Sequence, residues 1–161
     1  MNKEIKVGIA DMKMLRNEGV LITYALGSCV GISFYDPRIR LAALLHIMLP
    51  EAGGYSSESQ VYKFADTGIQ ETLRKMAVFG GNKSRYVCKI AGGAKMFEMQ
   101  GSSGIANIGQ RNIDSVKSIL NKEGIRVNGQ QVGENYARTM SIDVLTGKVK
   151  IRTFGRPEIV F

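Results

Sequence analysis

The sequence has few residues of the kinds that cross-link small proteins or build metal centres. The chain of 161 residues contains two cysteines, one histidine, three prolines and no tryptophan. Two cysteines cannot form a disulfide framework, and no Cys-x-x-Cys motif or Cys/His cluster indicates zinc. We therefore expect no metal and no other cofactor. Free thiols suit the reducing conditions of a cytoplasm.

Long apolar runs are also missing. No stretch approaches the roughly 18 apolar residues of a membrane-spanning helix, and residues 1–13 lack the apolar core of a signal peptide. We therefore expect a soluble, cytoplasmic protein with no direct membrane insertion. The 44% hydrophobic and 22% charged content is ordinary for a globular protein, and the length predicts one domain, residues 1–161.

Acidic residues are the scarcer charged type. The 22 Lys and Arg residues outnumber 14 Asp and Glu residues and give a net charge of +8. Such a charge favours an acidic partner, which could be nucleic acid, a membrane surface or an acidic protein face. The basic residues are dispersed, without a block of five and without interleaved aromatic residues, so we do not expect nucleic-acid binding.

The two most reactive side chains lie in one stretch, residues 23–50. Cys29 precedes the short apolar run 30–35, and His46 lies in a second apolar run, 41–48. An Asp-Pro dipeptide between the runs is typical of a type I turn. Two such runs around a short turn predict a β-hairpin.

The register of this hairpin depends on its turn. Pro37 disfavours a two-residue loop, because those turns need a positive φ at their first central residue. A four-residue loop from Asp36 to Ile39 predicts that Cys29 and His46 face each other directly, with Cβ atoms about 4.5–5.5 Å apart. A loop of three or five residues would put them on opposite faces.

The two faces of the predicted hairpin differ in character. One is wholly apolar: Val30, Ile32, Phe34, Leu41, Ala43 and Leu45. The other is mixed and has small residues near the cysteine: Cys29, Gly31, Ser33, Tyr35, Arg40, Ala42, Leu44 and His46. We expect the small residues to leave room for a substrate at the sulfur. A facing Cys and His is the minimum for a thiol nucleophile, although each residue alone is more often structural.

Several motifs resemble those of the CheD family of bacterial chemotaxis proteins. They are G-S-C-V at 27–30, H-x-M-L-P at 46–50, A-G-G at 52–54, G-G-A-x-M-F at 92–97 and N-I-G-x-R-N at 107–112. Together they span nearly the whole chain. Proteins of this family are chemoreceptor glutamine deamidases, and the resemblance implies a catalytic set of Thr23, Cys29 and His46.

The resemblance also implies the reaction and its partners. The reaction would be hydrolytic deamidation of glutamine side chains on methyl-accepting chemotaxis receptors, with receptor methylesterase activity as a second reaction. Gly27 and Ser28 would lie at the substrate, because backbone N–H groups in this turn can bind an oxyanion. The CheC phosphatase is an implied partner, and the alternative function is a non-catalytic module that binds and modulates CheC.

The rest of the pattern predicts an α+β domain with a mostly antiparallel or mixed sheet. Further strands are predicted at 4–10, 19–26, 86–91, 125–132, 137–145 and 148–154, helices from about 59 to 79 and from about 108 to 123, and a tail from 156; residues 12–17 are ambiguous. We expect the polar loop 51–59 to border a substrate groove. The resemblance adds a layered α/β/β sandwich similar to the deamidase domain of cytotoxic necrotizing factor toxins.

Overall fold

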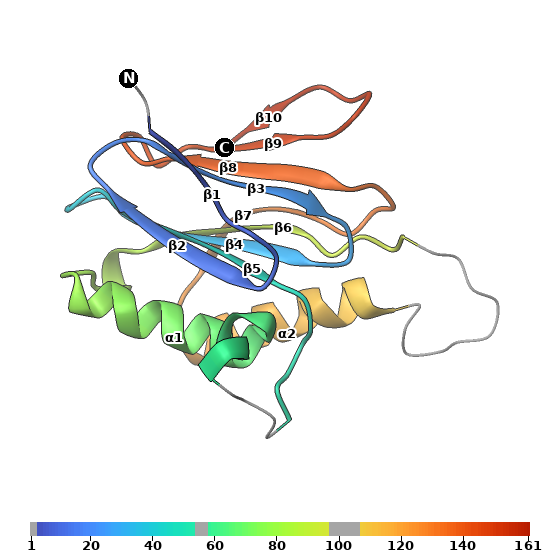
Figure 1. Cartoon of the computed structure of the whole chain (residues 1–161), viewed down its shortest axis with the longest axis horizontal. Helices are drawn as coiled ribbons and strands as arrows, with labels where there is room; N and C mark the ends of the chain where they lie inside the picture. The colour runs from blue at the N-terminus through green and yellow to red at the C-terminus, as the bar shows by residue number, and fades with distance from the viewer. Residues whose placement is uncertain (1–2, 54–57, 97–106) are drawn as a thin grey trace.

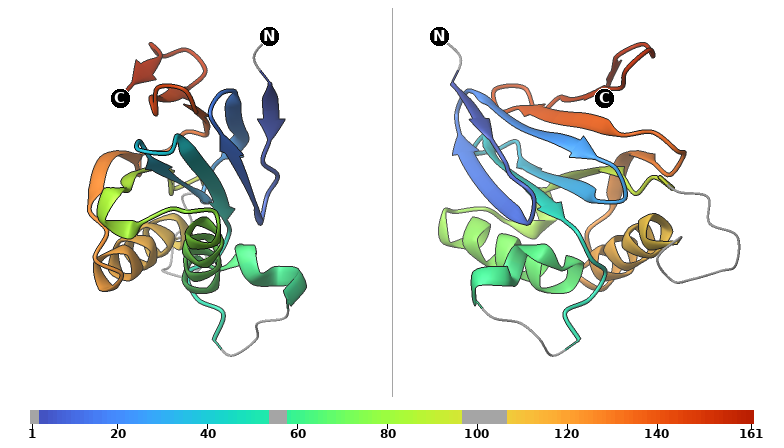
Figure 2. Two further views of the ribbon diagram at one scale, coloured as in Figure 1. Left: turned by 90° about the vertical axis from the view of Figure 1, so that its left-hand side faces the viewer. Right: turned by 45° about the vertical axis from the view of Figure 1, so that its right-hand side comes forward.

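A computed structural model describes residues 3–53, 58–96 and 107–161 of the protein. These residues form two five-stranded sheets and two α-helices (Figure 1). The sheets stack face to face, and both helices cover the outer face of one sheet, so the layers follow in the order α, β, β (Figure 2). This arrangement confirms the predicted α+β class with mixed sheets.

The central sheet carries the hairpin of Cys29 and His46. Its strand order is β2 (Asp11–Arg16), β5 (Leu41–Ile47), β4 (Val30–Asp36), β6 (Val87–Gly92) and β7 (Val127–Val132). All neighbours are antiparallel except β6 and β7. Residues 12–16 of the ambiguous stretch 12–17 are therefore part of an edge strand, β2.

The outer sheet has one face open to solvent. Its order is β1 (Glu4–Lys6), β3 (Val20–Leu26), β8 (Arg138–Asp143), β9 (Val149–Arg152) and β10 (Ile159–Val160). The predicted strand 4–10 is too long, because the chain turns at Ala10, which has a φ of +56°. The predicted tail instead pairs with β9 as β10.

Two helices pack against the outer face of the central sheet. They are α1 (Ala65–Val78) and α2 (Ile108–Lys122), and their buried stripes include Ile69, Leu73 and Met76 on α1 and Ile113, Val116 and Leu120 on α2. The first helix begins later than predicted, because Glu58–Lys63 forms a kinked 3-10 segment. Gly80 and Gly124 follow the helices with φ of +95° and +73°, the left-handed conformation that ends a helix. None of the helices in the described part of the chain is long and apolar enough to cross a bilayer.

Both hairpin faces are as predicted, but both are covered. The apolar face packs against α1 and α2. The mixed face lies between the two sheets, where Tyr35, Ala42 and Leu44 join a second core with residues of the outer sheet. The expected space beside Gly31 is filled, since an added Cβ there would lie 2.9 Å from Met140 Sδ. The mixed face beside Gly31 is therefore closed to solvent.

The predicted hairpin register is wrong by two positions. Gly31, not Cys29, lies opposite His46, and the last pair before the turn is Asp36 with Leu41. The reason lies in the turn, which consists of residues 37–40 and ends with Arg40 at a φ of +48°. A shift of two keeps every side chain on its predicted face.

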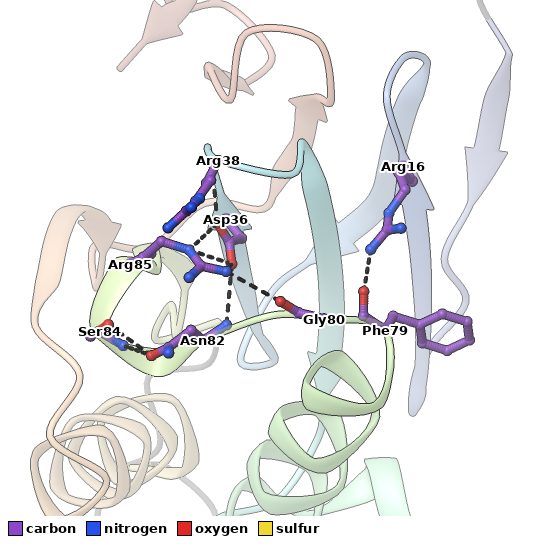
Figure 3. Close-up of polar contacts among 8 residues, drawn as sticks. All are labelled: Arg16, Asp36, Arg38, Phe79, Gly80, Asn82, Ser84 and Arg85. Atoms are coloured by element: carbon purple, nitrogen blue, oxygen red, sulfur yellow. Dashed lines mark hydrogen bonds and ion pairs between the residues drawn. The ribbon is translucent and has the colours of Figure 1, made fainter.

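Asp36 ties the turn of the hairpin to the connection between α1 and β6. Its side chain is fully buried and accepts hydrogen bonds from Arg85 Nε and Nη2 at 2.9 and 2.8 Å, and from the backbone N–H groups of Arg38 and Asn82 at 3.1 Å each (Figure 3). Burial acts to raise the pKa of Asp36, but these hydrogen bonds outweigh it and hold the pKa below its usual value. This network anchors the end of β4 that lies away from Cys29.

Parts of two predicted features lie outside the described residues. These are residues 54–57 of the loop 51–59, and residues 97–106 after the Gly92–Gly93 pair.

Candidate functional site

Cys29 lies in the short connection between the end of β3 and the start of β4, directly before Val30. Its thiol is free and partly exposed. Burial raises the pKa of Cys29, and its own backbone N–H offsets this only in part. The other cysteine, Cys88, is free and fully buried in β6. Cys29 is therefore the thiol that a substrate can reach.

The turn before the cysteine is held by its carbonyl groups. The oxygens of Gly27, Ser28 and Cys29 accept hydrogen bonds from Ala94 N (2.8 Å), Asn112 Nδ2 (2.9 Å) and Gly93 N (2.8 Å). Because the carbonyl groups are bound on the side of α2 and the 92–94 segment, the turn has a fixed orientation. Gly27 and Ser28, the two predicted substrate-binding residues, thus belong to the same fixed turn as Cys29.

Gly92 allows the two segments to approach each other. It has a φ of +106°, and a Cβ at this position would lie 2.2 Å from the carbonyl oxygen of Cys29. Only glycine fits both the backbone conformation and the space. The sequence showed a Gly-Gly pair here but not its contact with the cysteine turn.

His46 lies on β5 between the two sheets and is fully buried. Its Nδ1 is 2.7 Å from Thr23 Oγ1, and the same hydroxyl is 2.8 Å from the carbonyl oxygen of Val7. A carbonyl oxygen can only accept, so the hydroxyl proton goes to Val7 and the hydroxyl oxygen accepts from Nδ1–H. The neutral imidazole therefore carries its proton on Nδ1 and a lone pair on Nε2.

Of the two ring nitrogens of His46, Nε2 is the one that is free to act as a base. It is buried and has no hydrogen-bond partner among the described residues. Burial lowers the pKa of His46 to about 4, while the charge of Asp11, its partner on β2, acts in the opposite direction. At neutral pH the imidazole is thus uncharged and able to accept a proton.

Thr23 reaches His46 across the interface between the sheets rather than along one sheet. β3 belongs to the outer sheet and β5 to the central sheet. Cys29 lies on the same face as His46, two positions before Gly31, which is the residue opposite the imidazole. The structure thus joins Thr23 and His46 directly and places Cys29 diagonally from them.

Two residues of the site escaped the analysis of the sequence. Val7 acts through its backbone carbonyl, for which no side-chain signal exists. Asn112 belongs to the N-I-G-x-R-N motif, yet only the fold brings it to the cysteine turn. Among the described residues, no group of three or more His, Cys, Asp and Glu could hold a metal ion.

A partly exposed thiol directly before β4 and a neutral, hydrogen-bonded imidazole on the neighbouring β5 are the groups that a thiol-dependent hydrolase requires. A family model described as CheD chemotactic sensory transduction matches residues 48–153. Proteins named "Probable chemoreceptor glutamine deamidase CheD" match most of the chain. The protein of Desulforamulus reducens is 46% identical over 97% of this chain and 94% of its own length, and that of Pyrococcus abyssi is 42% identical over 94% and 93%. The chain belongs to the CheD family.

The relatives extend the match beyond the family model. The match to the family model begins at residue 48, after His46. The relative from Clostridium botulinum (strain Alaska E43) is 44% identical over 96% of this chain and 95% of its own length. Near-complete coverage includes most of the segment that carries Thr23, Cys29 and His46.

Proposed function

We propose that the protein hydrolyses specific glutamine side chains of methyl-accepting chemotaxis receptors to glutamate. The observation that carries this proposal is the hydrogen bond between Thr23 and His46, which leaves Nε2 as a free base on β5, the neighbour of the strand that begins directly after Cys29. The names of the relatives, chemoreceptor glutamine deamidases, support the same substrate class. The protein would act in the cytoplasm, where the receptor helices lie.

The first half of the reaction forms a thioester. His46 Nε2 takes the thiol proton as the sulfur of Cys29 attacks the carboxamide carbon. Backbone N–H groups at Ser28 and Cys29 stabilise the tetrahedral oxyanion. The protonated Nε2 then gives its proton to the leaving nitrogen, the C–N bond breaks, and ammonia departs.

The second half releases glutamate. Nε2 again accepts a proton, this time from a water molecule that attacks the thioester carbon. The C–S bond breaks, the thiol regains a proton from the imidazolium, and the side chain leaves as a carboxylic acid, which loses its proton to solvent at neutral pH. Since methanol leaves more easily than ammonia, the same groups would also hydrolyse a methyl ester, which we propose as a second reaction.

The protonation states suggest how the pair works. A raised pKa at Cys29 and a lowered pKa at His46 mean that both are neutral before substrate binds. Proton transfer therefore accompanies attack instead of preceding it. The Thr23 hydroxyl cannot stabilise an imidazolium as a carboxylate would, so its role is to fix the tautomer.

The test is a deamidation assay on a receptor cytoplasmic domain, with release of ammonia and mass spectrometry of receptor peptides as readouts. Wild-type protein should convert defined glutamines to glutamate, and Cys29→Ala and His46→Ala should not. Cys88→Ala is the matched control, since this thiol lies buried away from the site, and it should stay active. Full activity of Cys29→Ala would overturn the mechanism.

The alternative function is a non-catalytic module that binds and modulates CheC. In that case Cys29→Ala would bind CheC as wild type does, and the wild-type protein would leave every receptor glutamine unchanged. We also propose that the fold is similar to the deamidase domain of cytotoxic necrotizing factor toxins, which superposition of the two structures tests.

A further inference from the structure

We propose that Asn112 is a positioning residue that holds the Cys29 turn at a fixed distance from the His46 strand; this inference rests on the proposed function. Asn112 Nδ2 lies 2.9 Å from the carbonyl oxygen of Ser28 and 2.9 Å from that of Met48. Ser28 immediately precedes Cys29, and Met48 follows His46 by two positions. One amide group therefore joins the two segments that carry the thiol and the imidazole.

The two hydrogen bonds of Asn112 lie just beyond the point where the hydrogen-bond ladder between β4 and β5 ends. The last pair in the ladder between β4 and β5 is Val30 with Ile47. Cys29 and Met48 would form the next pair, but no ladder hydrogen bonds join them. The two N–H bonds of Asn112 replace the missing pair, and they do so at the position of the thiol.

An amide at this position needs a reason beyond packing. Asn112 is fully buried on α2, and its neighbours on the buried stripe are apolar. Its Oδ1 is buried and has no hydrogen-bond partner among the described residues. An unpaired buried acceptor destabilises a protein, and asparagine is a poor helix former. A leucine would avoid both costs, so the two donors explain the asparagine.

The first turn of α2, which precedes Asn112, packs against the segment of residues 92–94. Gly109 packs against the 92–94 segment so closely that a Cβ would lie 2.5 Å from the carbonyl oxygen of Ala94. This same segment holds the carbonyl groups of Gly27 and Cys29. Met48 is held independently, because its N–H donates to the Lys63 carbonyl at 2.8 Å. Asn112 thus connects two segments that each have their own anchor.

The test compares the Asn112→Leu variant with a control variant, Asn121→Leu. Asn121 lies on the same helix, α2, and its side chain is exposed. For Asn112→Leu we expect kcat to fall about 100-fold, because misplacement of reacting groups by about 1 Å has effects of this size, while KM stays near the wild-type value. Asn121→Leu should leave both constants unchanged. Circular dichroism and thermal unfolding establish that each variant is folded at the assay temperature.

A second readout does not need the receptor. The rate of alkylation of Cys29 by iodoacetamide, measured against pH, reports how the thiol and imidazole interact. We expect the Asn112→Leu profile to match that of His46→Ala, and the double variant to show no further change. A folded Asn112→Leu with a wild-type profile and wild-type kcat would overturn the proposal.

Two further outcomes are distinguishable. If wild type deamidates no receptor, the proposed function fails, while the alkylation profiles still decide whether Asn112 positions the pair. If Asn112→Leu does not fold, Asn112→Ser retains one donor for the two carbonyl groups, and its profile should lie between those of wild type and His46→Ala. A wild-type profile for Asn112→Ser would then count against the proposal.

Discussion

The tautomer of His46 can be tested by replacing Thr23 with valine, which has the same shape but no hydroxyl. In the wild type, Nδ1–H donates to Thr23 Oγ1 at 2.7 Å, and both side chains are fully buried. In Thr23→Val the proton either stays on Nδ1 without an acceptor or moves to Nε2. The second outcome blocks the atom that must take the thiol proton.

The structure sets the size of the expected effect. A buried N–H group without a partner costs about 1–3 kcal/mol, and each 1.36 kcal/mol in the activation free energy changes a rate tenfold. We therefore expect kcat for deamidation to fall about 5- to 150-fold in Thr23→Val. KM should change little, because Thr23 is buried and does not reach the substrate.

Thr23→Ser is the matched control, since it retains the hydroxyl that accepts from Nδ1 and donates to Val7. Its rate should stay close to the wild-type rate. Ammonia release from a receptor domain measures all three proteins at equal folded concentration. A folded Thr23→Val with wild-type kcat would refute the reasoning, because the tautomer would then not depend on the hydroxyl.

Three further predictions concern the thiol, the hairpin turn and the close approach at the site. Iodoacetamide should alkylate Cys29 but not Cys88 in the native protein, at a rate that keeps rising above the ordinary thiol pKa because burial raises the pKa of Cys29; equal labelling of both by mass spectrometry would contradict this. Asp36→Asn should lower the free energy of unfolding in urea by about 2 kcal/mol at pH 7. Because the pKa of Asp36 is depressed in the folded state, this difference should shrink as pH falls below about 4 and through that pKa, and a constant difference down to pH 2 would be inconsistent with it. Gly92→Ala should reduce both stability and kcat, since the added Cβ would collide with the cysteine turn. Gly124 also has a positive φ but open space around it, so the control variant Gly124→Ala should lose stability only.

Much of the fold follows from local patterns that the sequence contains. Alternation along the hairpin predicted its two faces correctly, and the rest of the pattern predicted both helices. The scarcity of reactive residues made Cys29 and His46 the candidates for a thiol site. These predictions succeed because side-chain periodicity and chemical type depend on the chain's own order.

The order of residues along the chain is therefore sufficient to predict the class of fold, the faces of the strands and the candidate residues. Which atoms meet depends on the packing of the folded chain. The left-handed Arg40 moved the hairpin register by two positions, the stacking of the sheets brought Thr23 to His46, and the packing of α2 brought Asn112 to the cysteine turn. These contacts depend on turn geometry and on the packing of distant elements, which no local repeat encodes. The low pKa of His46 likewise results from burial between two sheets, which exists only in the folded chain.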